Sequence, residues 1–355
     1  MENLKDICTE YIFGEREIYY ETLMFVAEKN GGFIPVKTLF QPEKIISVLS
    51  SSLEYAYEKN IDYVFTDEGM MPSAKTSMPY FEYDRYYLES DEHMRSFPME
   101  KGHLVFGEGA YFHTRQICVS YTRKEKGPEF DIPEKSSRLP KIHGKIKKQK
   151  KLNILFNGDS ITTGANSSGM KEINVKPYLP AFPELFTYKI EKTYGIKTNL
   201  VNIAEGGTNA AWGIDQSKKY LEKDGGILPD LYVIAFGMND ASGKVPVCDY
   251  ISNIKKIIIE ARTICPDCEF ILISTMLPNP VLPGFAGPHA DYENPLLSLE
   301  DEFSGLAVAN MTKTHRFLLK KKRYFDMTGN NVNHPNDFLA RIYAQTLLKT
   351  LGVYN

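Results

Sequence analysis

Residues 152–164 read Leu-Asn-Ile-Leu-Phe-Asn-Gly-Asp-Ser-Ile-Thr-Thr-Gly. The apolar run predicts a short buried strand, and the residues after it place Ser160 on a glycine-flanked corner where a helix can begin. A serine at such a corner is exposed and close to free backbone N–H groups, two conditions that nucleophilic acyl transfer requires. Glycine, aspartate and serine also form ordinary turns and helix N-caps, so this segment alone leaves both interpretations open.

Beyond this corner, short apolar runs alternate with helical patterns. The predicted strands are 152–156, 198–203, 231–236, 270–275 and 324–327, and the predicted helices lie near 179–193, 216–223, 251–264, 303–319 and 337–351. Strands that are apolar throughout are buried on both faces, which indicates a parallel sheet covered by helices. We therefore expect an α/β fold whose active site lies at the carboxyl ends of the strands.

Polar side chains and glycines follow the predicted strands at the points where they end. They are Ser160, the pair Gly206-Gly207, the segment Gly237-Met238-Asn239-Asp240, and the segment 328–335 with His334. Each has a structural explanation of its own, as a turn, a helix cap or a histidine before a proline. Together they predict that Ser160, Gly207, Asn239 and His334 converge at one edge of the sheet.

In order and spacing, these residues resemble the four sequence blocks of the SGNH (GDSL-type) hydrolases, a family of esterases and acylhydrolases. The matches are Gly158-Asp159-Ser160, Gly207, Gly237-Met238-Asn239-Asp240 and His334-Pro335, and the resemblance covers about residues 150–355. It implies a three-layer α/β/α sandwich with a five-stranded parallel sheet of the flavodoxin-like kind.

The resemblance also implies a role for each block. Ser160 would attack an ester carbonyl after His334 removes its proton. The N–H groups of Ser160 and Gly207 and the side-chain amide of Asn239 would hold the oxyanion. Such a mechanism needs neither a metal nor another cofactor.

One position departs from the family pattern. The family has an aspartate three residues before the histidine, where this chain has Asn331. An amide oxygen can orient an imidazole, but it cannot neutralise an imidazolium. Asn331 is thus a possible orienting residue for His334, and a backbone carbonyl that serves a Ser–His dyad is the alternative.

The first 140 residues are rich in tyrosine and phenylalanine and predict strands near 102–106, 116–121 and 80–87, with some helix possible at 42–57. We expect a β-rich sandwich or jelly-roll domain at 1–140, which resembles the extra domain of some bacterial carbohydrate esterases. Its aromatic residues form either a core or a sugar-stacking surface. The lysine-rich segment 141–151 predicts a solvated linker, and 152–355 the catalytic domain.

Composition limits the partners of the chain. A formal net charge of −3 gives no reason to expect nucleic acid or an anionic membrane, and the sequence contains no apolar stretch long enough to span one. Five cysteines and the absence of a signal peptide predict a cytoplasmic protein, or a secreted one if an export signal has been removed. We expect a small-molecule or oligosaccharide ester as substrate; the oligomeric state is not predicted.

Two further features have weaker functional interpretations. Cys265-Pro-Asp-Cys268 has redox or zinc spacing, but it follows a helical pattern rather than opening one, so a structural loop is favoured. His289 lies in a proline-rich loop at 278–295 that would border the substrate pocket, and it is either a substrate contact or a surface histidine.

The sequence therefore predicts a serine esterase that removes small acyl groups, O-acetyl in the first place, from a carbohydrate. A lysophospholipase or thioesterase is an alternative that a long apolar groove beside Ser160 would favour. Asn331 motivates a third hypothesis, a degenerate carbohydrate-binding protein without activity.

Overall fold

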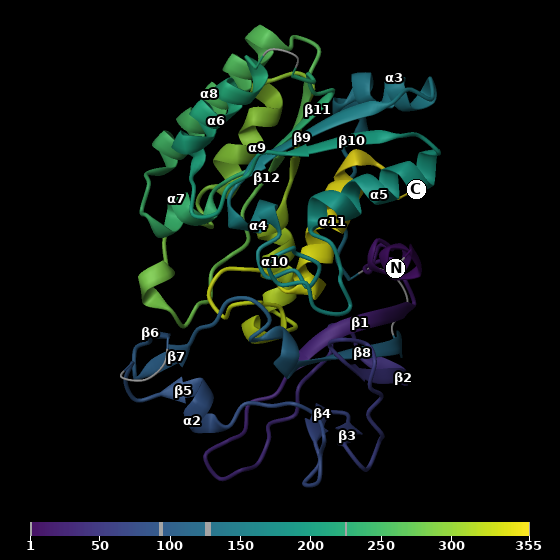
Figure 1. Cartoon of the computed structure of the whole chain (residues 1–355), viewed down its shortest axis with the longest axis vertical. Helices are drawn as coiled ribbons and strands as arrows, with labels where there is room; N and C mark the ends of the chain where they lie inside the picture. The colour runs from purple at the N-terminus through teal and green to yellow at the C-terminus, as the bar shows by residue number, and fades with distance from the viewer. Residues whose placement is uncertain (1, 92–94, 125–128, 224–225, 355) are drawn as a thin grey trace.

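The computed structural model of the chain describes residues 2–91, 95–124, 129–223 and 226–354. Its C-terminal part contains a five-stranded parallel sheet (Figure 1). In spatial order the strands are β10 (Thr198–Asn202), β9 (Leu152–Gly158), β11 (Leu231–Ala235), β12 (Glu269–Ile273) and β13 (Leu306–Ala309). This 2-1-3-4-5 order is the flavodoxin-like one, and it confirms the predicted fold class.

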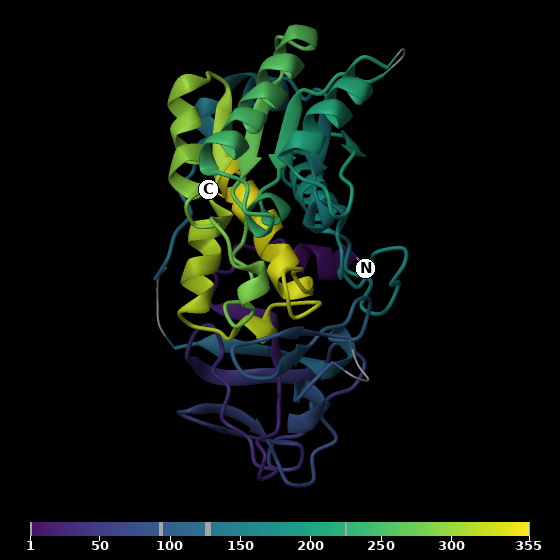
Figure 2. The ribbon, with the colours of Figure 1, turned by 90° about the vertical axis from the view of Figure 1, so that its left-hand side faces the viewer.

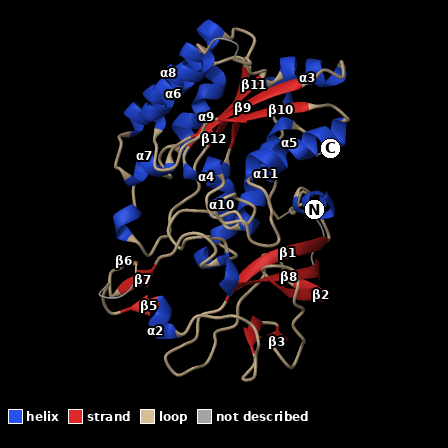
Figure 3. Ribbon diagram, in the orientation of Figure 1, coloured by secondary structure: helices blue, strands red, loops and turns tan. Residues whose placement is uncertain are grey.

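Helices cover both faces of this sheet, as Figure 3 shows with helices in blue and strands in red. Strand residues alternate between two hydrophobic clusters: Ile154 and Phe156 belong to one, and Leu155 to the other. The first cluster includes residues of α5 (Phe182–Tyr194) and α11 (Asp337–Leu351), and the second those of α6 (Ala210–Leu221), α8 (Val247–Ile264) and α9 (Glu293–Glu302). The short helices α4 (Ser160–Thr163) and α7 (Met238–Ser242) follow β9 and β11 directly.

The fifth strand is not where the sequence pattern predicted it. Residues 324–327 were expected to form it, but Tyr324–Asp326 is a 3₁₀ turn (η4), and the strand is β13, inside the stretch expected to be helical. All four residues of β13 are buried, and a short apolar run of this kind fits a helix or a strand equally well. Helix α10 (Met311–Leu319) begins only after Asn310, whose side chain accepts the Lys313 N–H.

The N-terminal region is rich in sheet, as predicted, but its strands form three small antiparallel sheets. Their orders are β1 (Glu17–Met24), β8 (Gln116–Arg123) and β2 (Pro42–Ser50); β3 (Tyr63–Thr66) and β4 (Gly69–Pro72); and β5 (Tyr87–Leu88), β7 (His103–Val105) and β6 (Ser96–Pro98). Two local predictions were wrong. The helix considered at 42–57 is largely strand β2, because it pairs with β8, and within 80–87 the segment Tyr83–Tyr86 is helix α2.

The lysine-rich segment 141–151 is not a solvated linker, because most of it belongs to helix α3 (Pro140–Lys147). Ile142 and Ile146 are buried, and the carboxylate of Glu269 accepts the N–H groups of Lys141 and Ile142 at the start of the helix. The lysines occupy the outer face of an amphipathic helix, a pattern that composition alone does not distinguish from a linker.

The N-terminal sheets lie at one end of the molecule and the α/β part at the other (Figures 1 and 2). Phe13, Leu23 and Ile117 belong to the same hydrophobic cluster as residues of α11. A fully buried ion pair joins Glu21 of β1 to Lys322 after α10. The remaining elements are α1 (Glu2–Cys8), η1 (His113–Arg115), η2 (Ser136–Arg138) and η3 (Pro283–Phe285). In the described residues, no helix has the length and apolarity that crossing a bilayer would require.

Candidate active site

Ser160 is the first residue of α4 and follows β9 after a single connecting residue. That residue, Asp159, caps the helix by accepting the Ile161 N–H at 2.9 Å. A Cβ atom on Gly158 would lie 2.6 Å from the Ala235 carbonyl oxygen of β11, so only glycine allows the strands to approach so closely at the corner. The sharp corner presents the serine at the carboxyl end of the sheet.

His334 meets Ser160 at this edge. Its Nε2 lies 2.9 Å from the Ser160 Oγ. The loop that carries His334 is held in shape by Asn330, whose Oδ1 accepts the N–H groups of Val332, Asn333 and His334, each at 3.0 Å. The histidine therefore sits on a rigid loop, within hydrogen-bonding distance of the serine oxygen.

The other ring nitrogen of His334 contacts Asn166, a residue that the sequence analysis did not single out. The Asn166 Oδ1 lies 2.7 Å from the His334 Nδ1. The amide nitrogen donates to the carbonyls of Gly109 and Gly329, both at 3.1 Å, which fixes the orientation of the amide group. Asn166 presents its amide oxygen, and not its amide nitrogen, to the ring. The imidazole therefore carries its proton on Nδ1 and leaves Nε2 free to accept from Ser160.

Glu108 also faces His334, and it comes from the N-terminal region. Its Oε2 lies 3.4 Å from the His334 Nδ1, and its side chain is 44% exposed. Burial raises the pKa of this carboxyl, but the hydrogen bond and charge of His334, with hydrogen bonds from Asn330 and Asn166, outweigh that effect and lower the pKa overall. Glu108 is therefore ionised at neutral pH.

Asn331, the predicted orienting residue, does not contact His334. Its Oδ1 accepts from the Tyr86 hydroxyl at 2.9 Å, and its amide nitrogen donates to the Val105 carbonyl at 3.0 Å. Its backbone has a φ of +71°, and its two side-chain hydrogen bonds hold the amide toward the N-terminal region instead of the imidazole. The prediction for Asn331 is corrected accordingly: Asn166 and Glu108 face the position that it was expected to occupy.

The glycine pair lies beside Ser160, and Asn239 bonds to the residue that follows this pair. A Cβ on Gly206 would lie 3.8 Å from the Ser160 Cβ, which places the glycine pair beside the nucleophile. Gly207 has a φ of +79° and is exposed, and among the described residues its N–H has no acceptor. Asn239 uses one amide hydrogen to bind the Thr208 carbonyl at 2.8 Å and keeps a second one. As the first helical residue, Ser160 also has an N–H without an intrahelical acceptor.

Two buried carboxyl groups, those of Asp159 and Asp240, stand next to Ser160 and Asn239 in the sequence. Burial raises the pKa of Asp159 to about 7 and that of Asp240 to about 6. Asp240 accepts the Ala210 N–H at the start of α6, at 3.1 and 3.2 Å. Asp240 thus links the segment 237–240 to the start of α6, which follows the pair Gly206-Gly207. This bond fixes the distance between the two segments.

A family model of the GDSL-like lipase/acylhydrolase family matches residues 156–342, which is more than half of the chain and includes Ser160, Asn239 and His334. The chain belongs to this family. It is therefore a carboxylic ester hydrolase by family. A search of curated proteins finds no match.

Solved structures resemble this acylhydrolase only distantly. A two-domain esterase active on acetylated mannans is 20% identical, with a TM-score of 0.46 over 62% of this chain and 54% of that one, so the chain aligns with about half of its length. A GDSL-family lipolytic protein from Veillonella parvula is 18% identical (TM-score 0.44; 55% and 96% covered). An acetylxylan esterase from Geobacillus stearothermophilus is 16% identical (TM-score 0.44; 57% and 94% covered).

His289 is buried, so a substrate cannot contact it. It is 1% exposed, and its Nε2 lies 3.2 Å from the Met238 carbonyl oxygen. Burial lowers its pKa, so the ring is neutral. Both earlier interpretations, a substrate contact and a surface histidine, are replaced by a structural role behind α7. Cys265 and Cys268 are free thiols, both buried, at the end of α8 and the start of β12.

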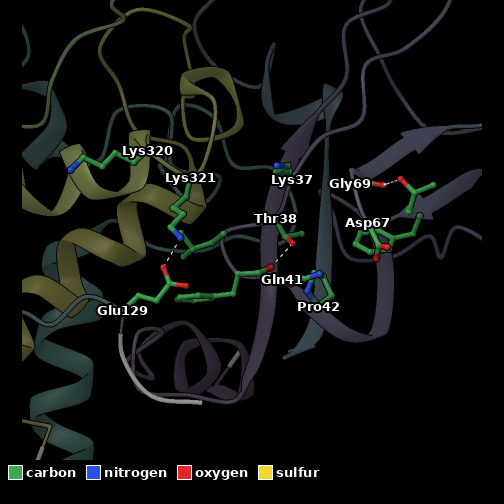
Figure 4. A pocket seen from close by; sticks show the side chains of 13 residues that line it. Lys37, Thr38, Gln41, Pro42, Asp67, Gly69, Glu129, Lys320 and Lys321 are labelled. Carbon is green, nitrogen blue, oxygen red and sulfur yellow. Dashed lines mark hydrogen bonds and ion pairs between the residues drawn. The ribbon is translucent and has the colours of Figure 1, made fainter. Parts of the chain in front are cut away.

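A hollow lies elsewhere in the molecule, away from the Ser160 site (Figure 4). It has a volume of about 360 Å³ and lies between the N-terminal sheets and the end of α10, where Lys321 pairs with Glu129 at 2.5 Å. None of its lining residues belongs to the Ser160 site, so it has no part in the chemistry considered below.

Asn166 and Glu108 were missed for understandable reasons. Asn166 is one polar residue in the run 164–168 after α4, and its positive φ of 65° is the only unusual feature of its backbone. Glu108 stands between two glycines in a part of the chain far from the family blocks. A glycine-flanked acid in a loop is a weak signal, because only the fold brings it to His334.

Proposed function

We propose that the protein is a serine esterase that hydrolyses short acyl esters, O-acetyl in the first place, on a carbohydrate. The observation that carries the proposal is the chain of contacts from the Ser160 Oγ through His334 to the Asn166 Oδ1, at 2.9 and 2.7 Å. These distances fit a nucleophile, its base and a group that orients the base.

The reaction follows from this geometry. His334 takes the proton of Ser160 on Nε2 while the Ser160 Oγ bonds to the ester carbonyl carbon. The carbonyl oxygen becomes an oxyanion, which receives hydrogen bonds from the N–H groups of Ser160 and Gly207 and from the second amide hydrogen of Asn239. His334 then gives its proton to the alcohol oxygen as the C–O bond breaks. Water, deprotonated by His334, releases the acyl group from Ser160 by the same steps.

The surroundings of Ser160 favour a short acyl group and a polar alcohol. The small hollow near α4, lined by Asp159, Ile161 and Tyr343 among others but not by Ser160 itself, has a volume of only about 10 Å³ and cannot hold an acyl chain. The residues beside the serine, Glu205 to Gly207, are exposed. A sugar hydroxyl can approach such a polar, open edge, whereas a long acyl chain gains little from it. These features favour the sugar ester over a lysophospholipid or thioester.

The contacts of His334 also bear on the third hypothesis, a degenerate binding protein. That hypothesis rested on Asn331, which cannot neutralise an imidazolium. Since Asn331 does not face His334 while Asn166 and Glu108 do, the substitution at Asn331 is no argument against activity.

Hydrolysis of p-nitrophenyl acetate by the wild type and by Ser160→Ala tests the proposal. We expect kcat/KM to fall roughly 10⁴-fold or more in Ser160→Ala, because the nucleophile is lost. Ser167→Ala is the matched control: among the described residues its buried hydroxyl has no hydrogen-bond partner, so activity should stay within about twofold.

Two series then define the substrate. Rates on p-nitrophenyl esters should fall as the acyl chain lengthens from acetate to octanoate, and acetylated oligosaccharides should release acetate. Wild-type activity that Ser160→Ala retains would overturn the nucleophile assignment, and a preference for octanoate would favour the lysophospholipase or thioesterase alternative.

A further inference from the structure

We propose that Glu108 of the N-terminal region is the carboxylate that supports His334. It would take the role of the family aspartate, whose position in this chain is occupied by Asn331. The inference rests on the proposed function and extends it. Glu108 is a positioning residue: it touches the base and acts on the substrate only through it.

The contacts at the His334 Nδ1 divide the work between two residues. A neutral imidazole has one hydrogen on this atom, and the shorter contact, 2.7 Å to the Asn166 Oδ1, receives it. The Glu108 Oε2 at 3.4 Å then acts mainly by its charge. Asn166 thus holds the tautomer, and Glu108 supplies the negative charge that an amide lacks when His334 becomes a cation.

Three asparagines of the catalytic part hold the loop that carries Glu108. Asn331 donates to the Val105 carbonyl at 3.0 Å, Asn330 to the Glu108 Oε1 at 3.2 Å, and Asn166 to the Gly109 carbonyl at 3.1 Å. These bonds span the loop on both sides of the carboxylate. The residue that stands in place of the family aspartate therefore anchors the segment that brings the carboxylate.

Apolar contacts fix the same loop at both of its ends. Val105 and Phe112 are 1% and 0% exposed and belong to one hydrophobic cluster. That cluster includes Val332, which lies two positions before His334 in the sequence. Because both ends of the loop pack together with the histidine segment, Glu108 is placed beside the ring before any substrate binds.

The charges around His334 agree with this role. Glu108, with its lowered pKa, and Asp159, with a pKa that burial raises to about 7, both interact with the charge of His334. The charge of Asp240 raises the pKa of Asp159, and burial raises the pKa of Asp240 as well. Near neutral pH Glu108 is fully ionised while Asp159 is partly protonated, so Glu108 is the main stabiliser of the imidazolium.

The test measures the pKa of His334 directly in the full chain, by ¹H–¹⁵N NMR of histidine-labelled protein, with His334→Ala to assign the signal. The variants are Glu108→Gln, which removes the charge but keeps an oxygen for Asn330, Glu108→Asp, which keeps the charge, and Glu100→Gln as an exposed control from the same region. In parallel, kcat and the acidic limb of kcat/KM against pH are measured on p-nitrophenyl acetate.

Removal of a neighbouring negative charge destabilises the imidazolium, so the pKa of His334 should fall in Glu108→Gln by about one unit. The acidic limb should move to lower pH by the same amount and kcat should fall about tenfold, since Asn166 still holds the tautomer. Glu108→Asp should recover part of both effects, and Glu100→Gln should match the wild type.

An unchanged His334 pKa in Glu108→Gln would overturn the proposal, as would a fall of equal size in Glu100→Gln. The NMR titration needs no turnover. If the wild type cleaves no ester, the proposed function fails, and the pKa difference still decides whether Glu108 is the charge partner of His334.

Discussion

Three asparagines near His334 have different tasks, because different groups surround their amides. Asn166 turns its oxygen to the imidazole because two carbonyls take its amide hydrogens. Asn330 turns its oxygen to three N–H groups of its own loop. Asn331 turns away and binds Tyr86 and Val105. The residue type is the same in each case, and the neighbours decide the function.

Restoring the family residue at position 331 should therefore fail. In Asn331→Asp, a carboxylate oxygen would face the Val105 carbonyl oxygen at about the present 3.0 Å, in a site that is 0% exposed. We expect the free energy of unfolding, measured with urea, to fall by about 2–4 kcal/mol and kcat not to rise.

Asn333→Asp is the control for this change, because its side chain already accepts a hydrogen bond from Asn330 and can continue to do so. It should change the free energy of unfolding by about 0.5 kcal/mol or less. A stable Asn331→Asp with a higher kcat than the wild type would contradict this account of position 331.

At the residue scale, the sequence predicted the residues that sit on short, regular connections. Ser160 follows β9 after one residue, Gly207 lies in the short connection after β10, and Asn239 lies in the short helix α7 after β11. β10 and β11 are the two strands beside β9. Asn166 and Glu108 lie on irregular loops, whose path depends on tertiary contacts that no local pattern encodes. The wrong expectation for Asn331 has the same origin: spacing fixed its position in the chain but not its direction.

At the scale of elements, α10 carries a histidine whose protonation is linked to folding. His315 is 0% exposed, and its Nδ1 accepts the Leu277 N–H at 3.0 Å. Burial lowers its pKa to about 3. In the unfolded chain the ring binds a proton near pH 6.5, so between these values the unfolded state holds more protons and acid favours unfolding.

We therefore expect His315→Gln to reduce the sensitivity of the fold to acid. Between pH 7.5 and 5.5, the wild type should lose about 1.4 kcal/mol of unfolding free energy relative to the variant, whatever their difference at pH 7.5. Urea denaturation at both pH values measures this. Parallel pH dependences in the two proteins would show that folding does not lower the pKa of His315.

The predicted elements succeeded where the hydrophobic pattern was long or closely bounded. Strands β9 to β12 and helix α11 lie within a few residues of their predicted places. The errors fall on short segments whose state is set by a neighbour: β13 pairs with β12, β2 pairs with β8, and α3 packs against β9. Tertiary contacts override local preference in such segments.

On the scale of the whole molecule, the N-terminal region and the α/β part depend on one another. They share a hydrophobic cluster, and the buried pair of Glu21 and Lys322 joins them. Glu21 also accepts the Leu39 N–H and the Tyr121 hydroxyl, each at 2.7 Å, so loss of Lys322 would leave a charge fixed in a dry site. The composition correctly predicted a β-rich region; its contact with His334 could be seen only in the fold.

The central claim, that Ser160 is the nucleophile of an ester hydrolase, is tested most directly by covalent labelling. The wild type and Ser160→Ala are incubated with a fluorophosphonate, and the labelled residue is located by peptide mass spectrometry. The account predicts one phosphonyl group on Ser160 in the wild type and none in the variant. A label on another residue, or a wild type that stays unlabelled, would contradict it.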